Sequence, residues 1–336
     1  MRGMLFCLIA VQALCAFVAA QDITTGNRNA GNPELITHAG PQLGFGPSMD
    51  SNARADVAGW TFRVQVSEVT VPFSVTNRNK AVAGVTAQDV RITDDGKPVQ
   101  NVAYFGHLAD LPLRFGLVID SSDSIIQRSY FEEEAAKTFL HRVLQKETDQ
   151  AFVMHFTSQS RFVQDLTTNV KQLDSAIAAL NPKGTTGMYD AVYAACKRLQ
   201  GMRDRQRLAN ILVLISDGDD NVSQTSLERV IAMAHASEVS IFSVSSNGGM
   251  KTRATRNLRQ LSEETGGRAF FVDESSQLVK AFTALGQEMR DRYVISYRPV
   301  DLKDDGRYHR IQLQVQKDGT AFRVLSRRGY YANPAD

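Results

Sequence analysis

The chain has 336 residues, of which 38 are Lys or Arg and 36 are Asp or Glu, so its formal charge is only +2. This near-neutral balance lacks the basic excess typical of nucleic-acid-binding proteins, and we do not expect nucleic acid as a partner. The length is sufficient for two domains.

The first twenty residues have the parts of a secretory signal. Arg2 is their only charged residue, an apolar run follows over 4–18, and small residues precede Gln21. The run is short for a spanning helix, so we expect cleavage after residue 20. The mature product would be secreted or periplasmic and would have no stable membrane span.

Three cysteines occur in the chain, and Cys7 and Cys15 would leave with the signal. Cys196 would then be alone, which excludes an internal disulfide in the mature chain. Its apolar neighbours at helical spacing predict a buried, inert side chain.

Residues 21–58 are rich in Gly, Asn, Pro and Ser, which predicts a flexible linker. Residues 59–108 instead contain short alternating runs separated by turns, such as Asp94-Asp95-Gly96-Lys97. Short strands spaced by turns predict the strands of a small β-sandwich.

From residue 111 to residue 290 the pattern changes. Apolar strands at 113–119, 151–156, 211–215, 239–244 and 268–272 alternate with helical stretches. The alternation predicts an α/β fold, a doubly wound and mostly parallel sheet with helices on both faces.

Residues 291–332 return to period-two strands, with a hairpin turn at 317–320. Three strands make too small a core to stand alone. We therefore expect them to pack with the N-terminal strands, so that a β-sandwich-like module from both chain ends flanks the α/β domain. A separate C-terminal appendage is the alternative.

One loop carries the clearest chemistry. Asp120-Ser121-Ser122-Asp123-Ser124 directly follows the buried strand at 113–119. Ligands of open α/β sheets bind at the carboxyl ends of the strands, and carboxylate and hydroxyl oxygens suit Mg²⁺, Mn²⁺ or Ca²⁺. One carboxylate among neutral hydroxyls would leave such an ion electron-poor and able to accept an acidic ligand from outside.

Two further loops carry matching groups. Gly184-Thr185-Thr186-Gly187 precedes a predicted helix, and Ser216-Asp217-Gly218 follows the strand at 211–215. Both loops are placed where they can converge on Asp120.

With these residues in place, the segment from 111 to 290 resembles the von Willebrand factor type A domain. Asp120, Ser122 and Ser124 match the first loop of that family's metal-ion-dependent adhesion site, and Asp217 matches the third. Thr186 matches the second loop, with Thr185 as the alternative. The flanks, including Arg328-Gly329-Tyr330, resemble a subgroup of secreted bacterial proteins related to this family.

The resemblance implies a divalent metal ion, with Mg²⁺ favoured and Mn²⁺ or Ca²⁺ as alternatives. Ser122 and Ser124 would bind the ion directly, Asp120 and Asp217 directly or through water, and Thr186 according to the state of its loop. A protein partner would supply a Glu or Asp carboxylate to the open position. Asp123, where the family often has Gly, is either a solvated turn residue or an added charge beside the metal.

The sequence thus favours a non-enzymatic, exported protein that binds a protein partner through a metal. A cell-envelope scaffold or assembly factor with a structural or vestigial metal site is the alternative. A metal-dependent hydrolase is a third interpretation, disfavoured because no candidate general base stands beside the metal loops.

Overall fold

The computed structural model describes residues 68–78, 80–121, 129–180, 185–200, 207–245, 248, 251–274, 277–299 and 306–332, without the side chains of 129–132. The predicted signal and linker lie outside these ranges. Residues 55–336 group into one compact unit.

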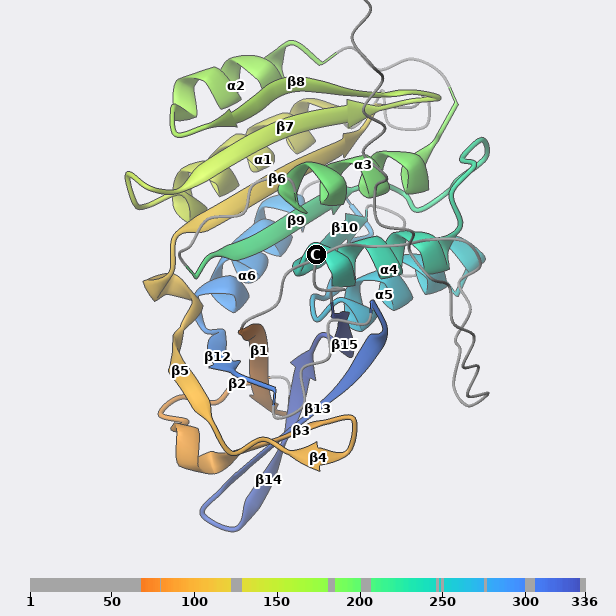
Figure 1. The fold of residues 1–336 in the computed structure, drawn as a ribbon. Helices are drawn as coiled ribbons and strands as arrows, with labels where there is room; N and C mark the ends of the chain where they lie inside the picture. The colour runs from red at the N-terminus through yellow and green to blue at the C-terminus, as the bar shows by residue number, and fades with distance from the viewer. Residues whose placement is uncertain are drawn as a thin grey trace, which may run out of the picture. The chain divides into compact units, whose positions relative to one another are not determined.

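A six-stranded sheet forms the centre of the α/β part, in the order β11-β10-β9-β6-β7-β8 (Figure 1). Its strands are β6 (Leu113–Asp120), β7 (Gln150–Phe156), β8 (Ser160–Thr167), β9 (Ala209–Ile215), β10 (Val239–Ser245) and β11 (Ala269–Phe271). Neighbouring strands pair in parallel except β8, which is antiparallel to β7.

Helices cover both faces of this sheet (Figure 1). They are α1 (Ser129–Val143), α2 (Val170–Ala178), α3 (Met188–Gln200), α4 (Leu227–Ala236), α5 (Arg253–Glu264) and α6 (Leu278–Arg290). Phe115 and Leu117 of β6 pack with α1, α2 and α6, whereas Val118 packs with α3, α4 and α5. Successive residues of a strand point to opposite faces, so both faces are apolar, and the predicted doubly wound fold is confirmed.

A second, nine-stranded sheet is antiparallel throughout, in the order β4-β3-β13-β14-β1-β12-β5, with β15 on β13 and β2 on β1. Its strands are β1 (Val69–Asn77), β2 (Lys80–Ala81), β3 (Val90–Asp94), β4 (Lys97–Pro98), β5 (Val102–His107), β12 (Tyr293–Tyr297), β13 (Tyr308–Lys317), β14 (Thr320–Ser326) and β15 (Gly329–Tyr331). Strand β1 lies between β12 and β14. Strands from both sides of the α/β segment therefore build this flanking sheet together, as predicted.

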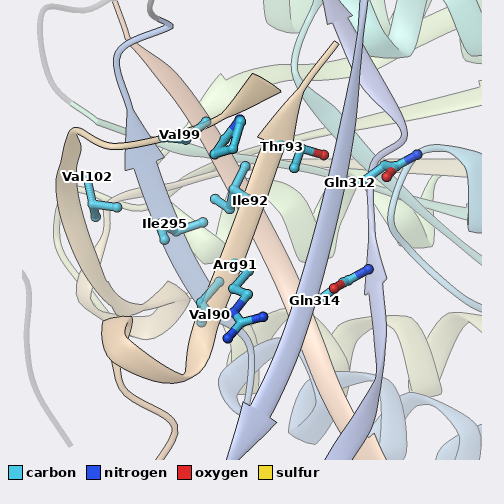
Figure 2. Close-up of a pocket in the computed structure, with 10 residues that line it drawn as sticks. Val90, Arg91, Ile92, Thr93, Val99, Val102, Ile295, Gln312 and Gln314 are labelled. Carbon is cyan, nitrogen blue, oxygen red and sulfur yellow. The ribbon is translucent and has the colours of Figure 1, made fainter. Parts of the chain in front are cut away.

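The flanking sheet curls over itself. The Tyr297 hydroxyl of β12 donates to Asp94 Oδ2 of β3 at 3.0 Å. Four strand spacings separate β12 from β3, about 19 Å across a flat sheet, which one Tyr side chain could not bridge. Ile92 of β3 and Ile295 of β12 both line one hollow of about 270 Å³, and Figure 2 shows these two side chains. One curled sheet thus supplies the sandwich-like arrangement.

A buried arginine joins the two sheets. Arg292 follows α6, is fully buried, and donates from Nη1 to Gly266 O (2.7 Å) and from Nη2 to Pro72 O of β1 (2.9 Å). Its guanidinium carbon lies 5.4 Å from the ring centroid of Phe242 in β10. Burial lowers the pKa of Arg292 to about 10, so the group remains charged at neutral pH. A nearby second arginine, Arg327, donates to Thr70 O at 2.9 Å.

His235 lies where α4 meets the flanking sheet. It is 4% exposed, its Nε2 lies 2.8 Å from Glu264 O, and its ring stacks on Tyr308 of β13 with centroids 5.4 Å apart. The carbonyl can only accept, so Nε2–H donates in the neutral ring. Burial lowers the pKa of His235 to about 4.

This histidine predicts a pH-dependent stability. In the unfolded chain His235 is protonated near pH 6.5, whereas in the folded chain it is protonated only near pH 4. The contribution of neutral His235 to the free energy of unfolding is therefore complete above pH 6.5 and is lost as the pH falls toward 4. Between pH 7.5 and 5 we expect His235 to account for about 2 kcal/mol of lost stability. In urea unfolding, the free energy of unfolding of His235→Phe should fall by about 2 kcal/mol less than that of wild type between pH 7.5 and 5. Equal losses in the two proteins would contradict the assignment.

Candidate metal centre

The candidate site begins where β6 and β9 end side by side. Ile119 pairs with Ile215. Asp120, the last residue of β6, and Ser216, the first residue after β9, therefore lie next to each other at this edge. The Ser216 hydroxyl donates to Asp120 Oδ2 at 2.7 Å, and the Asp120 side chain is almost fully buried. The apolar strand thus delivers a carboxylate to the carboxyl edge of the sheet, where a serine hydroxyl of the next strand orients it.

The loop after β9 holds Asp217 beside this pair. Asp217 is 7% exposed; its Oδ1 accepts from Asp219 N at 3.1 Å, and Gly218 N donates to Ser216 Oγ at 3.0 Å. These short-range bonds fix the loop conformation. Burial and the Asp217 charge raise the pKa of the exposed Asp219 carboxyl, so negative charge is concentrated here.

Thr186 reaches the same edge from the loop before α3. Its carbonyl accepts from Asn221 N at 2.9 Å, which ties its loop to the Asp217 loop, and Gly187 N donates to Thr157 O at 2.7 Å, just beyond β7. Ser121 N donates to Phe156 O of β7 at 2.9 Å. The structure therefore brings the loops of Asp120, Thr186 and Asp217 together. Thr186 is buried, whereas Thr185 is exposed.

Two other acids brace the site, and sequence reasoning did not assign them this role. Asp220 accepts from Tyr189 N (2.8 Å) and from Ser223 Oγ (2.7 Å). Asp190 accepts from the backbone N–H groups of Gln224 and Thr225, both at 3.0 Å.

Although burial opposes it, the hydrogen bonds from Thr225 and Gln224 hold the pKa of Asp190 below its usual value. Asp190 and Asp220 thus lock the start of α3 to the loop after β9. The sequence carried no local signal for this role, because the backbone N–H groups of Tyr189, Gln224 and Thr225 lie more than thirty residues along the chain from the acids that accept from them.

Ser122, Asp123 and Ser124 lie outside the described residues. The side chains placed at this edge nevertheless form a set of hard oxygen donors: the carboxylates of Asp120 and Asp217 and the hydroxyls of Thr186 and Ser216. Such a set suits a hard divalent cation such as Mg²⁺. The chemistry of the donors therefore fits the metal that the sequence predicts.

A doubly wound sheet with oxygen donors at its carboxyl edge defines an α/β ligand-binding domain. The family model for the von Willebrand factor type A domain matches residues 116–284, half of the chain, and the chain belongs to this family. The match covers all three loops of the candidate site.

Several solved structures are similar at low sequence identity. The vWF domain of the type V pili tip protein Mfa5 from Porphyromonas gingivalis is 14% identical with a TM-score of 0.44, covering 53% of this chain and 94% of that one. A von Willebrand factor type A protein from Catenulispora acidiphila is 13% identical with a TM-score of 0.45, covering 82% and 76%.

The PilB minor pilin from Streptococcus sanguinis is 14% identical with a TM-score of 0.43, covering 58% of this chain and 63% of that one. The present chain therefore spans less than two thirds of the pilin. No curated protein matches the sequence. Within the described ranges, every helix falls short of the length and apolarity that a membrane span requires.

Gly218 supplies a testable constraint on the Asp217 loop. Its φ is +87°, and an added Cβ would lie 2.7 Å from Leu258 Cδ1 and 3.1 Å from Ala254 O of α5. Gly319, in the β13–β14 turn, has a φ of +76° with nothing within 4 Å. Gly319→Ala should therefore cost only the left-handed backbone, about 1–2 kcal/mol.

Gly218→Ala should cost about 1–3 kcal/mol more, because the new methyl overpacks against α5. The free energy of unfolding in urea, measured for both variants, checks this difference. Equal costs would show that α5 does not constrain the loop.

Proposed function

We propose that this protein binds a protein partner through a divalent metal ion held at an adhesion-type site, with Mg²⁺ as the favoured ion. The observation that carries the proposal is the convergence of the Asp120, Thr186 and Asp217 loops at one sheet edge in a member of this family. Asp120, Ser122, Ser124, Thr186 and Asp217 would hold the ion. The burial of Thr186 and the exposure of Thr185 support the choice between them.

When bound, the ion would supply a positive centre that accepts an acidic side chain from the partner. The chain's own residues would prepare that centre. Ser216 orients the Asp120 carboxylate at 2.7 Å, and the bonds made by Asp190 and Asp220 tie the start of α3 to the chain segment after β9. A preorganised site spends less binding energy on ordering, so this bracing favours recognition.

The proposed role is binding rather than catalysis, in an exported protein. The donor set offers carboxylates and hydroxyls that position an ion, and the acids beside it, Asp190 and Asp220, already accept hydrogen bonds from backbone and hydroxyl donors. Neither of these two is poised as a general base. The signal sequence predicted at residues 1–20 supports export.

Removing the Asp120 carboxylate tests the site. Calorimetric titration of Mg²⁺ and Mn²⁺ into Asp120→Ala should show affinity at least about tenfold weaker than wild type, because even outer-sphere groups contribute that much. Asp219→Asn, which removes a nearby charge but no proposed ligand, should weaken the affinity less than Asp120→Ala does. A wild-type protein that binds neither ion would exclude the adhesion-type site.

Partner capture with and without EDTA separates the adhesion role from a scaffold role. Under the proposal, partners retained by wild type are lost in EDTA and are lost equally with Asp120→Ala. Partners that stay bound in both conditions would favour a scaffold or assembly factor with a structural or vestigial site.

A further inference from the structure

A second group of metal-ligating side chains lies in the flanking sheet. Asp94 ends β3, Asp95 begins the turn that follows, and His309 lies on β13, the neighbouring strand. One ligand atom from each of the three residues lies within 4.8 Å of the other two. His309 Nδ1 and Asp95 Oδ2 are 2.9 Å apart.

Groups behind these side chains hold them in place. The hydroxyls of Tyr297 and Tyr330 donate to Asp94 Oδ2 at 3.0 and 2.9 Å. Arg310 N donates to Asp95 Oδ1 at 2.8 Å, and the His309 ring stacks on Tyr330 with centroids 5.1 Å apart. Outer hydrogen bonds of this kind orient the ligands of metal sites.

The environment of the other Asp94 oxygen, Oδ1, points to a bound cation. Asp94 Oδ1 is buried and has no hydrogen-bond partner among the described residues. A buried carboxylate oxygen without a donor costs free energy, and a bound cation would remove that cost.

We propose that Asp94, Asp95 and His309 bind a divalent transition-metal ion, zinc in the first instance, at a site separate from the adhesion-type centre. One imidazole nitrogen and two carboxylate oxygens form a donor set that zinc accepts, with water completing the coordination. Donors bonded to tetrahedral zinc at about 2.0–2.1 Å lie about 3.3 Å apart. His309 Nδ1 and Asp95 Oδ2, which form an ion pair at 2.9 Å, would therefore separate only slightly to bind the ion.

The position of the site gives it a structural role. Strand β3 precedes the α/β domain and β13 follows it, and the two pair directly, Ile311 opposite Asp94. A metal here would cross-link the two ends of the domain. Cys196 is the single cysteine outside the predicted signal and is buried, so the metal would cross-link the chain as a disulfide does in exported proteins.

The test uses the chain from residue 21 onward without a histidine tag, stripped with EDTA, in the Asp120→Ala background, which weakens the adhesion-type site. At a hundredfold excess of Zn²⁺ over the dissociation constant, the melting temperature should rise by roughly 5 °C. The same addition of Zn²⁺ should not change the melting temperature of Asp94→Asn or His309→Gln, each made in the Asp120→Ala background. Calorimetry should show one zinc ion bound per chain in the Asp120→Ala protein and none in these two variants.

Two variants at different strands keep the test decisive if one of them folds poorly. An equal zinc shift in a folded His309→Gln protein, or no zinc binding by the parent, would overturn the proposal. Because Asp120 is already replaced, either failure leaves the adhesion-type proposal unaffected.

Discussion

The buried guanidinium of Arg292 is the interaction on which the relation of the two sheets depends. It reaches the carbonyl of Gly266 after α5, the carbonyl of Pro72 in the centre of the flanking sheet and the ring of Phe242 in β10. A buried charge is tolerated only where hydrogen bonds satisfy it. The contact therefore specifies one arrangement: a displaced sheet would leave both the charge and the carbonyls unsatisfied.

The connection after α6 reinforces this constraint. Helix α6 ends at Arg290 and β12 begins at Tyr293, so two residues separate the last helix of the α/β domain from the flanking sheet. Arg292 is one of those two. The flanking sheet is thus coupled directly to α6, the last helix of the α/β domain. Disrupting the flanking sheet should therefore also destabilise the α/β domain.

The α/β core could be predicted from the sequence because its strands are apolar on both faces, as in Phe115 and Val118, and because helices separate them. Strand β8 was not predicted, because Arg161, Gln164 and Asp165 interrupt the apolar pattern that marks the other strands. Polar residues are tolerated there because β8 lies at the edge of the sheet. The burial of Arg292 and Arg327 was not predicted either. It depends on carbonyl groups far away along the chain, which a local sequence pattern does not indicate. At the site, residue type and spacing were enough to predict the loop residues as oxygen donors. The pairing of Ser216 with Asp120 could not be predicted, because it depends on the register of β6 against β9.

The placement of β1 between β12 and β14 has a consequence for how the chain folds. More than two hundred positions separate Val71 from its partner Ile295. Strand β1 therefore meets β12 and β14 only after the whole α/β domain has been synthesised. Contacts of such long range slow folding. Until β12 and β14 arrive, the edges of β1 are unpaired apart from its short contact with β2. Early formation of the α/β core would then help to keep those edges from pairing with other chains.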